Sequence, residues 1–87
     1  MIEIELKYKL CDKDDLCVID YEREALFVFN NGQIFFGHSD GDIDTDENDE
    51  ETFGIKKENA RFALCMPYDR LIGWAYVDER VITDDVY

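Results

Sequence analysis

Apolar and charged residues alternate over the first ten positions of the chain, MIEIELKYKL. A period of two residues is typical of a strand with one buried face, so residues 1–10 are predicted as a strand. The polar run CDKDD over 11–15 predicts a turn. The apolar, β-branched run LCVIDY over 16–21 predicts a second strand. The charged residues 22–24 then form either a turn or a bend in a continuous strand.

The clearest local signal is Asn31-Gly32, which stands between the runs ALFVFN over 25–30 and QIFFG over 33–37. Both residues accept the positive φ angles of a two-residue type I′ turn, so this pattern predicts a β-hairpin. Such a turn pairs Phe29 with Ile34. It also puts aromatic side chains on both faces of the hairpin, so at least one face must be covered by other elements.

The second half of the chain is less regular. Residues 53–59 are ambiguous, and RFALCM over 61–66 fits either a helix begun near Lys56 or a strand. In the strand, Phe62, Leu64 and Met66 would share one face. Residues 67–69 predict a turn, because proline and aspartate interrupt the apolar pattern.

The run LIGWAYV over 71–77 predicts a strand in which Gly73 marks a bulge or a close approach. Residues 80–82 offer a short edge strand. The sum is a mainly β protein with a single domain over 1–87. We expect a small antiparallel β meander, either a sandwich or a partly open barrel, with an acidic loop at about 38–52 and at most one short helix.

Acidic charge dominates the composition. The 87 residues include 22 Asp and Glu against 9 Lys and Arg, which gives a formal charge of −13. Like charge at this density repels itself and lowers folding stability. The chain is nevertheless 46% hydrophobic and 14% aromatic, which is too rich for a disordered segment. Nucleic acids and anionic membranes would repel this surface, so its natural partners are basic proteins or cations.

Eight carboxylates fall within twelve residues, and they are the predicted partner-binding residues: Asp40, Asp42, Asp44, Asp46, Glu47, Asp49, Glu50 and Glu51. In an extended chain, every second residue would project on one side at intervals of about 6.6 Å. That row resembles the phosphates of a nucleic-acid strand, one per ~3.4 Å of axis. The alternative is a solvated surface loop.

The same stretch also carries the ligand spacing of an EF-hand-like calcium loop, at Asp40, Asp42, Asp44, Asp46, Asn48 and Glu51. Thr45 stands where the sharp turn of that loop needs glycine, and the preceding residues predict a strand rather than a helix. Weak cation binding is therefore favoured over a specific calcium site. We predict no dedicated metal site and no cofactor.

No catalytic motif is present: the chain lacks a P-loop, GxGxxG, GxSxG and CxxC. His38 has no second histidine or nearby cysteine to form a metal site with it. A nucleophile pair of His38 with Cys17 or Cys65 stays open, but nothing in the spacing favours it. An enzyme is not expected, and no catalytic residue is predicted. Cys17 and Cys65 lie in apolar runs and are predicted to be buried thiols.

Three sparsely spaced cysteines do not form a disulfide framework, and the start of the chain lacks the apolar core of a signal peptide. No apolar run approaches the ~18 residues of a membrane span. These features predict a reduced, cytoplasmic protein. Among the aromatic residues, Tyr68, Trp74 and Tyr76 are predicted either as core or as anchors for a partner.

In length, charge, lack of catalytic motifs and carboxylate row, the chain resembles the small acidic inhibitors of phages and mobile elements, the nucleic-acid mimics of the anti-CRISPR and anti-restriction type. This resemblance implies a non-enzymatic inhibitor in the bacterial host cytoplasm, acting as a monomer or small homo-oligomer. Its partner would be the basic cleft of a CRISPR effector or another nuclease. An immunity protein against a basic nuclease toxin and a cation- or calcium-binding module remain the alternatives.

Overall fold

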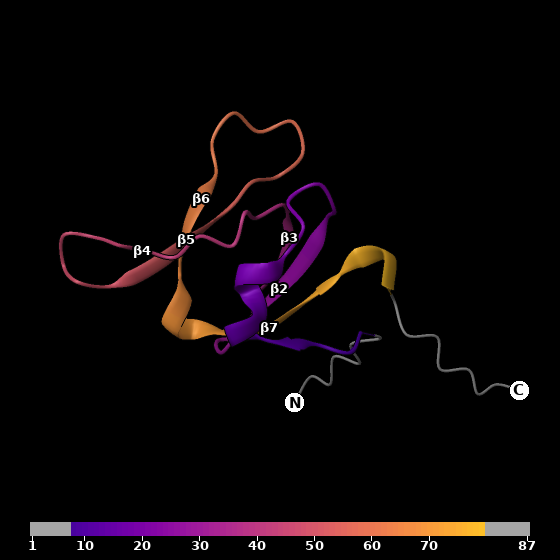
Figure 1. Cartoon of the computed structure of the whole chain (residues 1–87), viewed down its shortest axis with the longest axis horizontal. Helices are drawn as coiled ribbons and strands as arrows, with labels where there is room; N and C mark the ends of the chain where they lie inside the picture. Colours follow the sequence, from indigo (N-terminus) through magenta and orange to yellow (C-terminus); the bar gives the residue numbers. More distant parts are fainter. Residues whose placement is uncertain (1–7, 80–87) are drawn as a thin grey trace, which may run out of the picture.

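Seven short strands form two antiparallel sheets in the computed structural model, which describes residues 8–79 (Figure 1). The strands are β1 (Cys11–Asp12), β2 (Ala25–Phe29), β3 (Ile34–Gly37), β4 (Asp44–Thr45), β5 (Glu51–Ile55), β6 (Leu64–Pro67) and β7 (Leu71–Tyr76). One sheet has the order β1-β7-β2-β3, and the other has the order β4-β5-β6. The mainly β prediction is confirmed.

Helical structure is limited to three 3-10 segments in the described part of the chain: η1 (Lys13–Val18), η2 (Tyr68–Arg70) and η3 (Val77–Glu79). No helix among residues 8–79 has the length and apolar character needed to cross a membrane. The predicted edge strand at 80–82 lies outside the described residues, as does most of the strand predicted over 1–10.

The prediction for 11–21 is wrong. The first paired strand is Cys11–Asp12, where a turn was expected, and η1 covers most of the segment expected to be the second strand. Leu16 and Ile19 are both buried, whereas Cys17 and Val18 between them are exposed. A spacing of three residues matches the period of a 3-10 helix, which apolar composition alone does not distinguish from a strand. The chain then turns at 21–23, which agrees with the turn and not with the continuous strand expected at 22–24.

The hairpin between β2 and β3 is confirmed, but its register differs by one residue. Val28 pairs with Ile34, and the amide of Phe29 donates to the carbonyl of Gln33 at 2.9 Å. The loop therefore has three residues. Gly32 has a φ of 90°, whereas Asn31 is not among the residues with positive φ. Gly32 thus supplies the left-handed position of a G1-type loop, and the predicted pairing of Phe29 with Ile34 is wrong.

In the second half, the strand alternative is confirmed for β6, and the helix begun near Lys56 is wrong. Phe62 precedes this strand and is exposed, so it does not share a buried face with Met66. Gly73 was predicted to mark a bulge or a close approach of two backbones, and both are present. A Cβ there would lie 2.7 Å from the carbonyl oxygen of Cys11. The register between β2 and β7 also shifts at this point, leaving Ile72 unpaired and exposed.

Aromatic side chains from both sheets build the core. Phe27 pairs with Trp74 on β7, and both are at most 2% exposed. From β5, the Phe53 ring centroid lies 5.8 Å from that of Phe27 and 6.1 Å from that of Phe29. Trp74 is therefore a core residue and not a partner anchor.

Tyr68 in η2 extends this core toward η1. Its ring centroid is 6.3 Å from that of Phe53. Its hydroxyl lies 3.1 Å from the carbonyl oxygen of Lys13, to which it donates, and 3.3 Å from a carboxylate oxygen of Asp14. Burial, and then the contact with Asp14, raises the pKa of Tyr68. This contact favours the protonated phenol, so its contribution to stability is lost as the pH rises above the ordinary value of about 10.

We predict that Phe53→Ala lowers the free energy of unfolding by about 3–5 kcal/mol, because it leaves a cavity between the two sheets. Val18→Ala is the control, since Val18 is 71% exposed, and it should change stability by less than about 0.5 kcal/mol. Urea denaturation followed by fluorescence measures both. A loss below about 1 kcal/mol for Phe53→Ala would show that the sheets do not depend on this ring.

Candidate functional site

The acidic stretch folds into a β-hairpin rather than an unstructured loop. Asp44 of β4 pairs with Thr52 of β5, and Thr45 pairs with Glu51. Asp46 closes the turn between the strands, because its Oδ1 accepts the amides of Asn48 at 2.8 Å and Glu50 at 2.9 Å. One carboxylate thus satisfies two turn amides, which holds the hairpin that projects at the left of Figure 1.

The carboxylates do not form the straight row expected of an extended chain, so that part of the prediction is wrong. Gly41 has a φ of 78°, and Asp40 Oδ1 accepts the amide of Asp42 at 3.0 Å. This turn presses Gly41 against η1, where a Cβ would clash with the carbonyl oxygen of Leu16. All eight predicted carboxylate residues are nevertheless exposed.

The fold gathers most of these acids on the outward surface of the three-stranded sheet. Phe53 and Ile55 of β5 are buried in the core, so Thr52 and Gly54 between them face outward. Thr52 and Gly54 line a hollow of about 210 Å³. One wall of this hollow contains Asp40, Asp42 and Asp44, and the other contains Ala63, Leu64 and Cys65.

A second hollow, of about 550 Å³, continues along the same sheet. Its carboxylates are Asp46, Glu50, Glu51 and Asp69. Thr52 and Cys65 line both hollows, and the Sγ of Cys65 lies 3.6 Å from the Oγ1 of Thr52. The acidic face is defined here by the carboxylates of the two hollows: Asp40, Asp42, Asp44, Asp46, Glu50, Glu51 and Asp69.

The acidic face contains six of the eight predicted residues. Glu47 and Asp49 lie in the hairpin turn and line neither hollow. Sequence reasoning missed Asp69, which follows β6 in η2 and enters the site only through the pairing of β6 with β5. It also missed the apolar wall. Arg70 is a basic residue that lines the second hollow, and its carbonyl oxygen accepts the amide of Asn30 at 2.8 Å.

The other polar residues singled out in the sequence have simpler surroundings. His38 Nδ1 lies 2.9 Å from the carbonyl oxygen of Tyr21. Among residues 8–79, no three His, Cys, Asp or Glu side chains are arranged to hold a metal ion. Cys17 and Cys65 are exposed, so the prediction of buried thiols is wrong. Cys11 is half-buried, and burial raises the pKa of its thiol.

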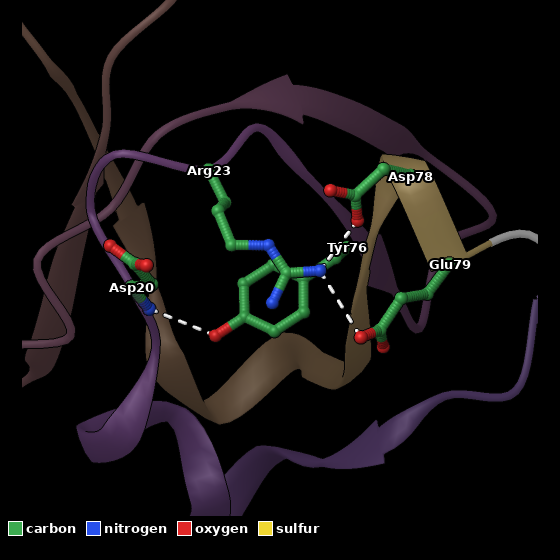
Figure 2. A network of polar contacts seen from close by, with 5 residues as sticks. All are labelled: Asp20, Arg23, Tyr76, Asp78 and Glu79. Atoms are coloured by element: carbon green, nitrogen blue, oxygen red, sulfur yellow. Dashed lines mark hydrogen bonds and ion pairs between the residues drawn. The ribbon is translucent and has the colours of Figure 1, made fainter.

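A separate charged cluster ties the loop before β2 to the end of β7 (Figure 2). The guanidinium of Arg23 lies 3.6 Å from the centroid of the Tyr76 ring, and its Nη2 donates to Asp78 at 2.5 Å and to Glu79 at 3.1 Å. The Tyr76 hydroxyl accepts the amide of Asp20 at 2.9 Å. The hydrogen bonds that Arg23 donates to Asp78 and Glu79 raise the pKa of its guanidinium, so it remains charged. The half-buried side chain of Tyr76 therefore makes its contacts with Arg23 and Asp20 within the fold.

The chemistry of the acidic face suits cationic groups. Carboxylate oxygens accept charge-assisted hydrogen bonds from Arg and Lys, and Arg binds carboxylate with the same fork that binds phosphate. Comparison with family models, with curated proteins and with solved structures gave no match to this chain.

The turn at Asp46 provides a test of the hairpin. Asp46→Ala removes the acceptor of the Asn48 and Glu50 amides, whereas Asp46→Asn keeps an acceptor oxygen and removes only the charge. We predict faster hydrogen exchange at Asn48 and Glu50 in Asp46→Ala than in Asp46→Asn, measured by NMR. Equal exchange rates in the two variants would mean that the side chain does not hold this turn.

Proposed function

We propose that this protein is a non-enzymatic inhibitor whose acidic face binds the basic nucleic-acid-binding cleft of a bacterial defence nuclease, a CRISPR effector or a restriction enzyme. It would act in the host cytoplasm by occupying the place of the nucleic acid. The main support is that folding gathers seven carboxylates around two hollows on one sheet surface. The proposal also draws on the resemblance to small acidic mimics.

Charge supports this proposal in two ways. A net charge of −13 on 87 residues attracts a basic cleft over a distance comparable to the Debye length, about 10 Å at 0.1 M salt, and speeds association. The same charge opposes direct binding to nucleic acid. Electrostatic complementarity thus selects the protein groove and rejects the polyanion that normally fills it.

The hairpin supports a binding role over a purely solvated loop. Asp46 holds its turn and Asp40 holds the bend at Gly41, so the backbone around these carboxylates is ordered before a partner arrives. Pre-organised groups lose less conformational entropy on binding than the side chains of a disordered segment.

Two variants with the same net charge test where the binding site lies. The face variant carries Asp40→Asn, Asp42→Asn, Asp44→Asn and Glu51→Gln. The control variant carries Asp12→Asn, Asp15→Asn, Glu22→Gln and Glu24→Gln, which lie outside the acidic face. Each removes four negative charges and retains acceptor oxygens, so both should fold, which circular dichroism would verify.

The target is first captured from a lysate of the bacterial host and identified by mass spectrometry, and its association with each variant is then measured by surface plasmon resonance. We predict that the face variant associates at least about tenfold more slowly than the wild type, because it lacks the charges that meet the cleft. The control variant should change the rate by less than about threefold. Equal slowing in both variants would show that only net charge matters. A captured nuclease toxin would instead indicate an immunity protein.

A further inference from the structure

Phe62 is the most exposed large apolar side chain among the described residues, at 81% of its surface. It lies in the loop over 56–63 that joins β5 to β6 and extends upward in Figure 1. The loop turns at Asn59, which has a φ of 70°, and the amide of Ala60 donates to the carbonyl of Lys57 at 3.0 Å. Phe62 is therefore presented to solvent by an ordered turn, and no part of the described core contains it.

The loop that carries Phe62 leads directly into the acidic face. The two residues that follow Phe62, Ala63 and Leu64, form part of the apolar wall of the hollow above Gly54. Leu64 is itself 46% exposed, and Ile43, between two acids of the opposite wall, is 36% exposed. Three exposed apolar residues thus lie in or next to the two chain segments, 40–44 and 63–65, that line this hollow. Exposed apolar groups clustered beside charged residues are typical of a surface that a partner covers.

We propose that Phe62 takes the place of a nucleobase. The acidic face would occupy the phosphate positions of a groove, and the Phe62 ring would stack on the aromatic side chains that normally hold an unpaired base. The partner class is therefore a groove that binds single-stranded nucleic acid, because such grooves combine a basic track with aromatic stacking platforms. This inference rests on the proposed function and narrows its target.

A cleft that binds duplex DNA is a poorer fit to an exposed aromatic ring than a groove that binds a single strand. The bases of a duplex remain stacked inside the helix, and a cleft that holds it contacts mainly phosphates and groove edges. A mimic of duplex DNA needs charge and has no use for an isolated aromatic ring. A target that receives an unpaired base would bind the exposed ring of Phe62.

The test replaces Phe62 while leaving all carboxylates in place, and it measures the dissociation constant for the same captured target by surface plasmon resonance. The variants are Phe62→Ala, Phe62→Leu, Phe62→Tyr and Phe62→Trp, with Val18→Ala as an exposed apolar control on η1. We expect Phe62→Ala and Phe62→Leu to bind between about fivefold and about 150-fold more weakly, the range for loss of one base–aromatic stack. Phe62→Tyr, Phe62→Trp and the control should stay within about twofold of wild type.

Two results would overturn this inference. Unchanged binding of Phe62→Ala would show that the ring does not touch the target. Full binding by Phe62→Leu would show an ordinary apolar pocket instead of a stacking platform. Failure of the proposed function would look different, because the face variant would then bind like the control variant whatever residue stands at position 62.

As an independent readout, the target is loaded with single-stranded oligothymidylate or with a duplex of equal length. The wild type should be displaced by the single strand at lower concentration than by the duplex. Equal or stronger displacement by the duplex would also contradict a base-stacking role.

Discussion

Packing of Phe53 against Phe27 and Phe29 joins the three-stranded sheet to the four-stranded sheet. Because side chains alternate along β5, the same strand that buries Phe53 and Ile55 turns Thr52 and Gly54 outward. One short strand therefore supplies both the inner contact and the floor of the acidic face. Mutual repulsion of the carboxylates opposes this arrangement, and the buried aromatic contacts must offset it.

This division of β5 links the stability of the fold to the position of the acidic face. A chain with 22 acidic residues could keep them dispersed in solvent, yet seven of them line two hollows on one sheet surface. Their positions depend on two backbone features, the Asp46 turn and the bend at Gly41. The Arg23 cluster pairs Asp78 and Glu79 with a cation, whereas no ion pair within residues 8–79 involves a carboxylate of the acidic face.

The parts of the fold that the sequence predicts have strong local signals. Asn31-Gly32 marks the β2–β3 hairpin, although the number of loop residues, and hence the register, depends on Asn31 avoiding positive φ. The apolar run of β7 and the close approach at Gly73 are also readable from composition. The run 16–21 has the composition of a strand, but burial at Leu16 and Ile19 follows the 3-10 period, which depends on tertiary packing.

The candidate site was only partly predictable for the same reason. Acidic residues close together in sequence were visible at once, and six of the eight belong to the acidic face. Asp69, Ala63 and Leu64 join them through the pairing of β5 with β6, which no local pattern specifies. Phe62 looked like a buried strand residue because it alternates with Leu64 and Met66, but the strand begins only at Leu64.

Competition with nucleic acid tests the central claim most directly. The captured target is bound to a fluorescent oligonucleotide, the protein is titrated in, and anisotropy and size-exclusion chromatography are followed. Mutual exclusion is predicted: anisotropy falls to the value of the free oligonucleotide, excess oligonucleotide displaces the protein, and the protein alone leaves the oligonucleotide signal unchanged. A stable ternary complex of protein, target and oligonucleotide, with the oligonucleotide affinity unaltered, would contradict mimicry of nucleic acid by the acidic face.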